Sequence, residues 1–399
     1  MNPEGPLVTS HEIGLGVIGA GGFGLYALQQ FTQVPGVRLV AMAGTHRPAA
    51  QAAARRFDIP DLQEVDVLLG REDVDLVYIA TPPFLHHPQA LAALAVGKHV
   101  ICEKPLAMTV EQADEMIVAA HRADRLLVTN LMQRYNPLFD KVTRLIGSRV
   151  LGEVLHGSFE NYASDENLPA EHWFWDRSKS GGIFVEHAVH FFDLFAGWLG
   201  EGSVDAARAG VRPGTTLEEH VGCTLRYGKT TTVDFYHGFH QAGRMDRQRL
   251  HLLFERGEVT LSGWIPTQAR LHALVDEKQT RELCELFPGA RLDVSSSYAP
   301  GERQCRGRGK DLDAWQLIDL TYGEGTLKAH LYGDLLRAML ADQLDWVRDH
   351  AHQRRMTEEN GRAALRSACA ADRLAHPGRE ARDPGASAAG RAMTTTYEA

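Results

Sequence analysis

The feature that most constrains the fold is a glycine-rich turn between a strand-like and a helix-like stretch. Ile13 to Ile18 is an apolar run of strand length, residues 19–24 read Gly-Ala-Gly-Gly-Phe-Gly, and a helical stretch follows to about Val34. In this setting the motif G-x-G-x-x-G marks a dinucleotide-binding turn, whereas a plain glycine-rich turn is the alternative. The first glycine makes the turn, the second lets the backbone approach a pyrophosphate, and the third lets the helix pack on the strand. The predicted cofactor-binding residues here are Gly19, Gly21, Gly22, Phe23 and Gly24.

The end of the next strand bears on which dinucleotide binds. Val37 to Ala43 is followed by Gly-Thr-His-Arg, with no acidic residue to bind a ribose 2′-hydroxyl. A nearby arginine can instead bind a 2′-phosphate. We therefore predict a site for NADP, with NAD as the alternative, that uses Thr45, His46 and Arg47. The other reading is that Arg47 only opens the next helix.

Strands and helices then alternate as far as residue 130. Such alternation predicts a doubly wound parallel sheet. The expected helices are 47–57, 64–70, 86–96 and 109–123, and the expected strands are 74–80, 100–102 and 126–130.

The third and fourth strands end in turns that carry polar residues. Thr81-Pro82-Pro83 follows one strand, and Glu103-Lys104-Pro105 follows the other. Ligands of open parallel sheets bind just beyond the carboxyl ends of the strands. Thr81, Pro82 and Glu103 are therefore predicted to bind the cofactor, and Lys104 to face its reactive end. We also predict a cis Lys104-Pro105 bond, because cis peptides are nearly confined to X-Pro. A solvated Glu-Lys pair is the alternative.

The second half changes character, because strands follow one another without intervening helices. This pattern predicts a large, mostly antiparallel sheet. The expected strands are 152–163, 203–212, 219–227, 230–240, 248–255, 257–263 and 268–275. The predicted organisation is an extension (1–12), a dinucleotide-binding domain (13–131), an α+β substrate and oligomerisation domain (132–350) with a polar, irregular insertion (276–325), a helix (351–375) and a disordered tail (376–399).

One predicted helix, 182–199, interrupts the strands and carries ionisable residues. Glu186, His190 and Asp193 are spaced i, i+4 and i+7, which places them on one face of an α-helix. Ionisable groups on an apolar helix are costly to bury. Glu186 and His190 could move a proton. A structural hydrogen-bond network is one alternative, and a metal site from Glu186, His187 and His190 is another. We predict no metal, because the spacing is not His-Glu-x-x-His.

Composition excludes several classes of function. A net charge of −9 gives no electrostatic basis for binding nucleic acid, and no apolar run approaches the roughly 20 residues that span a bilayer. The first twelve residues lack the apolar core of a signal peptide. Five scattered cysteines, with no CxxC pair, are typical of reduced thiols in the cytoplasm.

Taken together, the glycine loop, the Thr-Pro-Pro and Glu-Lys-Pro turns and the Glu186–His190–Asp193 pattern resemble the Gfo/Idh/MocA family of NAD(P)-dependent oxidoreductases. The resemblance covers roughly residues 12–265. It implies a Rossmann domain followed by an α/β domain with a large open sheet. It also implies that Lys104 and His190 flank the reacting carbon of a sugar, inositol or related polyol. Glu186 stands where the family usually has Asp, and Ala188 where it usually has Gly.

The resemblance and the residues together define the expected site. His190 would take the hydroxyl proton, Lys104 would hydrogen-bond the same oxygen, and Glu186 would support them. The residues expected to bind the substrate are Lys104, Arg134, Tyr135, Trp173, Glu186, His187 and Asp193. Two other functions stay open, namely a lyase or epimerase that recycles a tightly bound cofactor, and a non-catalytic sensor. An open sheet face needs covering, so we expect a homo-oligomer through the carboxy-terminal sheet.

Overall fold

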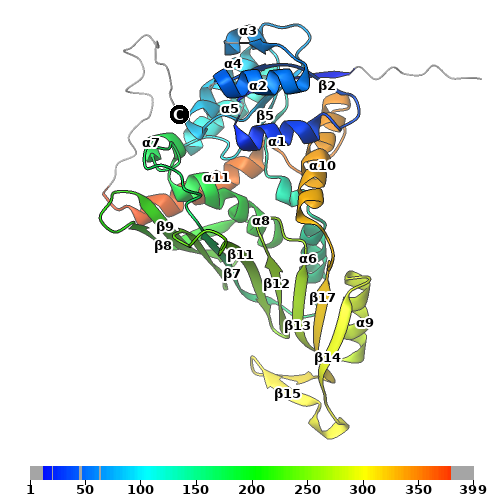
Figure 1. The fold of residues 1–399 in the computed structure, drawn as a ribbon. Helices are drawn as coiled ribbons and strands as arrows, with labels where there is room; N and C mark the ends of the chain where they lie inside the picture. The colour runs from blue at the N-terminus through cyan, green and yellow to red at the C-terminus, as the bar shows by residue number, and fades with distance from the viewer. Residues whose placement is uncertain (1–11, 20, 45–46, 63, 379–399) are drawn as a thin grey trace, which may run out of the picture. The chain divides into compact units, whose positions relative to one another are not determined.

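The computed structural model of this chain describes residues 12–378 except 20, 45, 46 and 63, with backbone only for 47, 49, 50, 61 and 62. The chain divides into two compact units, which Figure 1 shows as a ribbon. Unit 1 holds the residues up to Asn130 together with Leu336–Glu358. Of the described residues, unit 2 holds Leu131–Leu335 and Glu359–Gly378.

Unit 1 is built on a six-stranded parallel sheet in the order β3-β2-β1-β4-β5-β6, the order of a doubly wound dinucleotide-binding fold. β1 and β4 are buried along their whole length, as expected for strands covered on both faces. The alternation predicted from the sequence is confirmed. The strands are β1 (Ile13–Ile18), β2 (Val37–Ala43), β3 (Asp61–Leu62), β4 (Leu76–Ile79), β5 (His99–Cys102) and β6 (Leu127–Thr129). The helices are α1 (Gly22–Phe31), α2 (Arg47–Phe57), α3 (Val65–Leu69), η1 (Pro83–Leu85), α4 (His86–Ala95) and α5 (Val110–Ala123).

Unit 2 contains a nine-stranded sheet in the order β14-β17-β13-β12-β11-β7-β10-β9-β8. Among the described strands of this nine-stranded sheet, only β7 and β10 pair in parallel, so the prediction of a mostly antiparallel sheet is confirmed. The strands are β7 (Val154–Ala163), β8 (Gly202–Val211), β9 (Glu218–Tyr227), β10 (Thr231–Phe239), β11 (Arg247–Phe254), β12 (Gly257–Ser262), β13 (Ala269–Val275), β14 (Arg291–Ser297) and β17 (Gln316–Tyr322).

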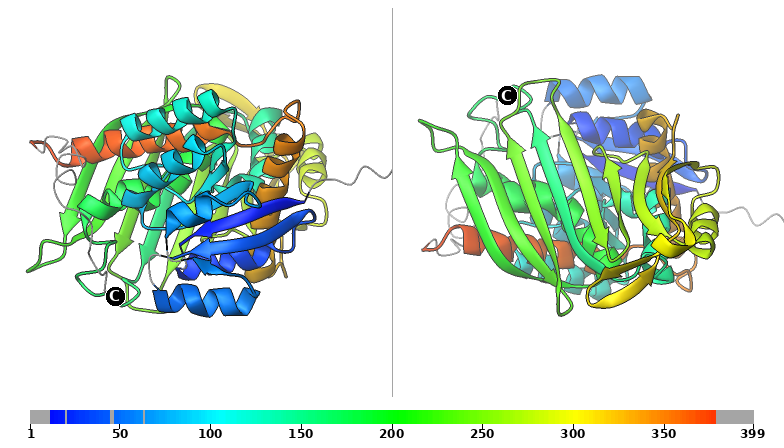
Figure 2. Two further views of the ribbon diagram at one scale, coloured as in Figure 1. Left: turned by 90° about the horizontal axis from the view of Figure 1, so that it is seen from above. Right: turned by 90° about the horizontal axis from the view of Figure 1, so that it is seen from below.

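Helices pack on one face of this sheet. Seen from below in Figure 2, the opposite face is not covered by any helix of the described residues. The alternation along β10 gives the reason, because Val233, Phe235 and His237 are buried while Asp234 is exposed. Phe159 of β7 stacks on Phe191 with ring centroids 3.5 Å apart. The helices of unit 2 are η2 (Met132–Tyr135), α6 (Pro137–Ser148), α7 (Arg177–Ser180), η3 (Phe184–Ala188), α8 (Val189–Leu199), α9 (Glu277–Leu286), η4 (Pro300–Glu302) and α11 (Glu358–Ala375). The remaining helix, α10 (Lys328–Arg348), begins in unit 2 and belongs to unit 1 from Leu336 onward.

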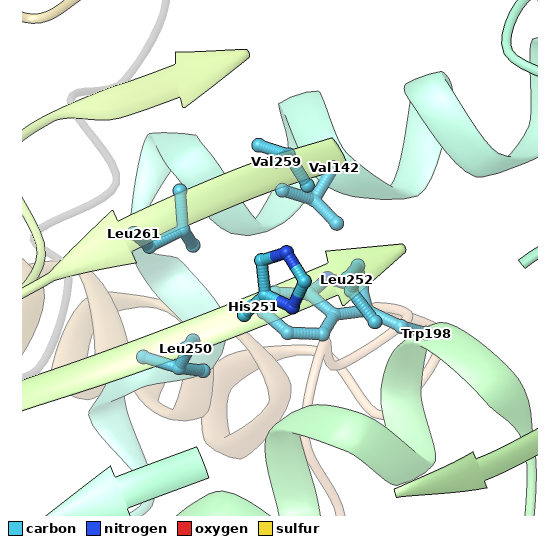
Figure 3. Close-up of a pocket in the computed structure, with 7 residues that line it drawn as sticks. All are labelled: Val142, Trp198, Leu250, His251, Leu252, Val259 and Leu261. Carbon is cyan, nitrogen blue, oxygen red and sulfur yellow. The ribbon is translucent and has the colours of Figure 1, made fainter. Parts of the chain in front are cut away.

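The apolar core of unit 2 is closely packed where helices meet the sheet. Figure 3 shows a gap there between α6, α8 and strands β11 and β12. The gap has no room for a water molecule, and its lining is almost wholly apolar. Its lining residues are Val142, Trp198, Leu250, His251, Leu252, Val259 and Leu261. We therefore assign it to core packing and not to ligand binding.

Residues 276–325 differ from the irregular insertion that composition suggested. They contain α9, β14 and β17, and a two-stranded ribbon of β15 (Gln304–Gly307) and β16 (Lys310–Asp313). β17 extends the large sheet beside β13, because Ile318 and Leu320 alternate with more exposed residues. β14 lies at the sheet edge with mostly exposed side chains, which accounts for part of the polar composition. Among the described residues, no helix is both long and apolar enough to cross a membrane.

Candidate functional site

The glycine loop of unit 1 has the geometry that a pyrophosphate needs. Gly19 has a φ of +105°, and an added Cβ there would lie 2.5 Å from the carbonyl oxygen of Ala80. A Cβ on Gly24 would lie 2.8 Å from that of Ala80, so this glycine allows α1 to pack against the end of β4. At Gly21 and Gly22 an added Cβ would meet no atom within 4 Å. The open space lies at the start of α1, where free N–H groups favour an anion, so the loop fits a dinucleotide.

The residues predicted to select NADP are only partly described. Thr45 and His46 lie outside the described residues, as does the side chain of Arg47. The described backbone shows that β2 ends at Ala43 and that α2 begins at Arg47. Their role in binding the cofactor stays a prediction.

A buried histidine connects the two polar turns of unit 1. His86 is fully buried at the start of α4. Its Nε2 lies 2.8 Å from the carbonyl oxygen of Thr81, and its Nδ1 lies 2.7 Å from that of Pro105. The Thr81 hydroxyl also donates to Gln89. Sequence reasoning missed His86, although a histidine five residues after a strand-end threonine was a visible signal.

The turn after β5 places an acid and an amine side by side. The Glu103 carboxylate is buried and accepts hydrogen bonds from the Tyr78 hydroxyl and from the Asn130 amide, the latter at 2.7 Å. Burial raises the pKa of Glu103, and the bonds from Tyr78 and Asn130 and the Lys104 charge partly offset this. The cis Lys104-Pro105 bond is confirmed. These contacts support a role for Glu103 in holding the turn, and its contact with a cofactor stays a prediction.

The ionisable segment of unit 2 is not one regular α-helix. Phe184–Ala188 forms a π-helical turn, η3, and the α-helix α8 starts at Val189. Glu186 lies in the π turn and His190 in α8, and both are buried. The prediction of one regular α-helix over 182–199 is therefore wrong, whereas a shared face for Glu186 and His190 stays a prediction. Such π turns often occur at functional sites.

A buried acid holds the entry to the π turn. The Glu218 carboxylate on β9 accepts from the Ile183 N–H at 2.8 Å and from Arg177 at 2.7 Å. Gly182 has a φ of +86°, and an added Cβ would lie 2.2 Å from the Arg177 guanidinium. Sequence reasoning missed Glu218, since its partners are about 40 residues away in the chain.

Asp193 and Arg134 pair with each other inside unit 2. Two guanidinium nitrogens of Arg134 lie 2.7 and 2.9 Å from the Asp193 carboxylate, and Arg134 also donates to the Asp193 carbonyl at 2.8 Å. Burial raises the pKa of Asp193, against the lowering effect of Arg134. These contacts fit the structural hydrogen-bond network that was one alternative in the sequence analysis. Substrate binding by Arg134, Asp193 and the neighbouring Tyr135 stays a prediction.

Aromatic rings surround the histidines of this segment. The ring of Trp264, directly after β12, lies 4.9 Å from the ring of His187 and 5.2 Å from that of His190. His187 also lies 5.1 Å from the ring of Phe239 at the end of β10. Sequence reasoning missed Trp264, whose signal was a Gly-Trp pair at a strand end.

The loop before η3 reaches the same region of unit 2. The Glu186 charge acts on His172, although burial is the larger effect and lowers the pKa of that histidine. Trp173 is half-buried in this loop, whereas Trp175 is buried. A substrate contact by Trp173 stays a prediction.

One group among the described residues has metal-ligand geometry. It differs from the group Glu186, His187 and His190 that the sequence analysis considered. Glu218, Asp372 and His376 place ligand atoms within 4.8 Å of one another. Arg177 pairs with Glu218 at 2.7 Å and with Asp372 at 2.6 Å. A guanidinium therefore already supplies the positive charge that these carboxylates need.

Comparison with known families agrees with this geometry. The family described as "Oxidoreductase family, NAD-binding Rossmann fold" matches residues 13–131, and the "GFO/IDH/MocA C-terminal domain" matches residues 139–260. The chain belongs to the GFO/IDH/MocA oxidoreductase family. The resemblance seen in the motifs is thus confirmed.

Individual relatives of this GFO/IDH/MocA protein carry sugar-related names. It is 32% identical to a 1,5-anhydro-D-fructose reductase of Ensifer adhaerens over 49% of this chain and 65% of the relative. It is 29% identical to a 2,7-anhydro-N-acetylneuraminate hydratase of Mediterraneibacter gnavus over 45% and 48%. The fold is similar to that of a levoglucosan dehydrogenase solved with NADH and L-sorbose (TM-score 0.71, 18% identity, 92% of this chain and 97% of that one). The matches thus span about half to two-thirds of these curated relatives.

Proposed function

We propose that this protein transfers a hydride between a nicotinamide cofactor and a hydroxyl or carbonyl carbon of a sugar, inositol or related polyol. The observation that carries the proposal is the glycine loop, where Gly21 and Gly22 leave open space at the start of α1. Family membership supports it, as does a relative named 1,5-anhydro-D-fructose reductase. We favour NADP over NAD, because no acid follows β2 and Arg47 comes close behind it.

In this proposal each side chain has a separate task. The nicotinamide supplies or accepts the hydride when bound. His190 exchanges the proton of the reacting hydroxyl, and Lys104 stabilises charge on the same oxygen. Glu186, four residues before this histidine in the chain, supports the two groups. Trp264 packs against the His190 ring, and an aromatic surface of this kind also suits the apolar face of a sugar ring.

A redox-recycling lyase or hydratase is the second candidate function. The relative named 2,7-anhydro-N-acetylneuraminate hydratase favours it. Both candidates need the same cofactor loop and the same proton-transferring histidine. They differ in whether the cofactor leaves after each turnover.

A fluorescence titration with NADPH and NADH, followed by a turnover screen, tests the proposal. Candidate substrates are 1,5-anhydro-D-fructose, levoglucosan and myo-inositol. We expect tighter binding of NADPH and net oxidation or reduction of free cofactor. A cofactor that co-purifies and never exchanges, with product formed at constant absorbance at 340 nm, would favour recycling. Failure of both nucleotides to bind would overturn the proposal.

We further infer a cytoplasmic homo-oligomer. Five free cysteines support the location, and the sheet face without a helix in Figure 2 supports assembly through unit 2. Light scattering at micromolar concentration tests the assembly, and a monomer would contradict it.

A further inference from the structure

A pair of buried histidines lies next to the proposed proton-transferring residue. His187 of η3 and His237 of β10 bring their Nδ1 atoms to 2.9 Å. This is the distance of an N–H···N hydrogen bond, in which one nitrogen donates and the other accepts. The ring that holds the shared proton therefore determines what the second nitrogen of His187 can do.

The surroundings of His237 keep this ring neutral. His237 is fully buried, and its ring lies 5.1 Å from the ring of Phe159 and 6.1 Å from that of Phe191. Burial lowers the pKa of His237 to about 3, so the ring carries one proton at neutral pH. That proton sits on either Nδ1 or Nε2.

The second nitrogen of His237 decides between the two tautomers. Its Nε2 is buried and has no hydrogen-bond partner among the described residues. A proton there would leave a buried N–H without an acceptor, which is rarer and more costly than an unused lone pair. The proton of His237 therefore belongs on Nδ1, from which it is donated to Nδ1 of His187. A neutral His187 must then carry its own proton on Nε2.

His187 and His190 lie beside the same aromatic ring. The centroid of the Trp264 ring is 4.9 Å from that of His187 and 5.2 Å from that of His190. We propose that His237 is a positioning residue that fixes His187 as the neutral Nε2–H tautomer, so that His187 donates a hydrogen bond to a substrate oxygen and leaves proton transfer to His190. The donor suits a sugar hydroxyl, carbonyl or carboxylate oxygen. The tautomer stands independently of the proposed function, whereas the contact with substrate rests on it.

Two substitutions separate the donor of His237 from its bulk. His237→Leu removes the donor, and His237→Asn keeps an amide N–H near the position of Nδ1. His156→Leu, on β7 of the same sheet but half-buried, is the matched control. The direct readout is the ¹⁵N spectrum of the histidine side chains in the full chain without ligand, with the His187 signals assigned from His187→Gln.

The spectrum of the unmodified protein decides the tautomer by itself. We expect the His187 signals to show a bare Nδ1 and a protonated Nε2 near pH 7. This pattern should persist in His237→Asn and His156→Leu and become a mixture in His237→Leu. A protonated Nδ1 on His187 in the unmodified protein would overturn the proposal, even if the leucine variant fails to fold. So would an unchanged His187 spectrum in a folded His237→Leu protein.

The role toward substrate has a separate readout. With NADPH and 1,5-anhydro-D-fructose, or the sugar that the screen identifies, we expect His237→Leu to raise KM about tenfold with a smaller change in kcat, because a lost donor weakens binding. His237→Asn should restore KM. Equal falls in kcat for both variants, with unchanged KM, would overturn the donor role. If no sugar turns over while the tautomer is as expected, the proposed function has failed and the tautomer assignment has not.

Discussion

The imidazole of His86 lies 2.7 Å from the carbonyl oxygen of Pro105, the residue that follows Lys104. The other ring nitrogen lies 2.8 Å from the carbonyl oxygen of Thr81. Carbonyl oxygens only accept hydrogen bonds, and a neutral imidazole has one N–H, so such a ring donates to one of these oxygens at a time. His86 thus holds together the two turns where parallel sheets of this type bind ligands.

Replacing His86 with leucine should leave a buried carbonyl oxygen without its donor and remove the side chain that joins the two turns. We expect the free energy of unfolding to fall by about 2 kcal/mol or more, measured by urea denaturation. His87→Leu is the matched control, because this neighbouring histidine only pairs with the more exposed Glu115, a contact worth at most about 1 kcal/mol. Equal losses in the two variants would contradict the role of the bridge.

His376, just after α11, should make the stability of unit 2 fall as the pH rises. Its Nε2 lies 3.1 Å from Glu218, and its Nδ1 lies 3.2 Å from Asp372. The bond from Glu218 raises the pKa of His376, against partial burial and the charge of Arg177. A histidine with a raised folded-state pKa adds stability below its ordinary value of 6.5, and this is lost as the pH rises through the folded value.

Thermal unfolding between pH 6 and pH 8.5 measures this contribution. The midpoint of the unmodified protein should exceed that of His376→Gln most at pH 6, and this difference should shrink as the pH rises, because buried histidines with a lowered pKa, such as His237, act in both proteins alike. His330→Gln, at an exposed position, should leave the dependence unchanged. An identical dependence in the unmodified and His376→Gln proteins would disprove the contribution.

The strands, the parallel order and the Lys104-Pro105 isomer could be predicted because local patterns determine them. A strand buried on both faces is apolar throughout, and a glycine-rich loop between a strand and a helix is typical of a dinucleotide-binding turn. The contacts of the candidate site in unit 2 could not be predicted from such local sequence patterns. Its contacts join distant positions, such as His187 with His237 and Asp193 with Arg134, and a single sequence does not pair them. The π turn at Glu186 was missed because periodicity assumes 3.6 residues per turn.

Substitution of Lys104 or His190 should lower the catalytic rate without weakening cofactor binding. Lys104→Met and His190→Asn each remove a group that transfers or stabilises charge in the proposed reaction. We expect kcat to fall by about 10²- to 10⁴-fold, while the Kd for NADPH stays within about threefold. His272→Gln, which loses only an exposed pair with Asp319 across β13 and β17, should keep the full rate. Near-complete activity in both site variants would refute the assignment.

Two glycines of one loop should give opposite results when each is replaced by valine. Gly21 has a φ of −72°, which any residue adopts, and an added Cβ meets no atom within 4 Å. Gly21→Val should therefore leave the thermal midpoint almost unchanged. It should still raise the Kd for NADPH about tenfold or more, because the backbone there must approach the pyrophosphate closely. Gly24→Val places its Cβ 2.8 Å from that of Ala80, so it should lower the free energy of unfolding by about 1–3 kcal/mol. If Gly21→Val bound NADPH like the unmodified protein, the open space at the start of α1 would not be where the cofactor phosphates bind.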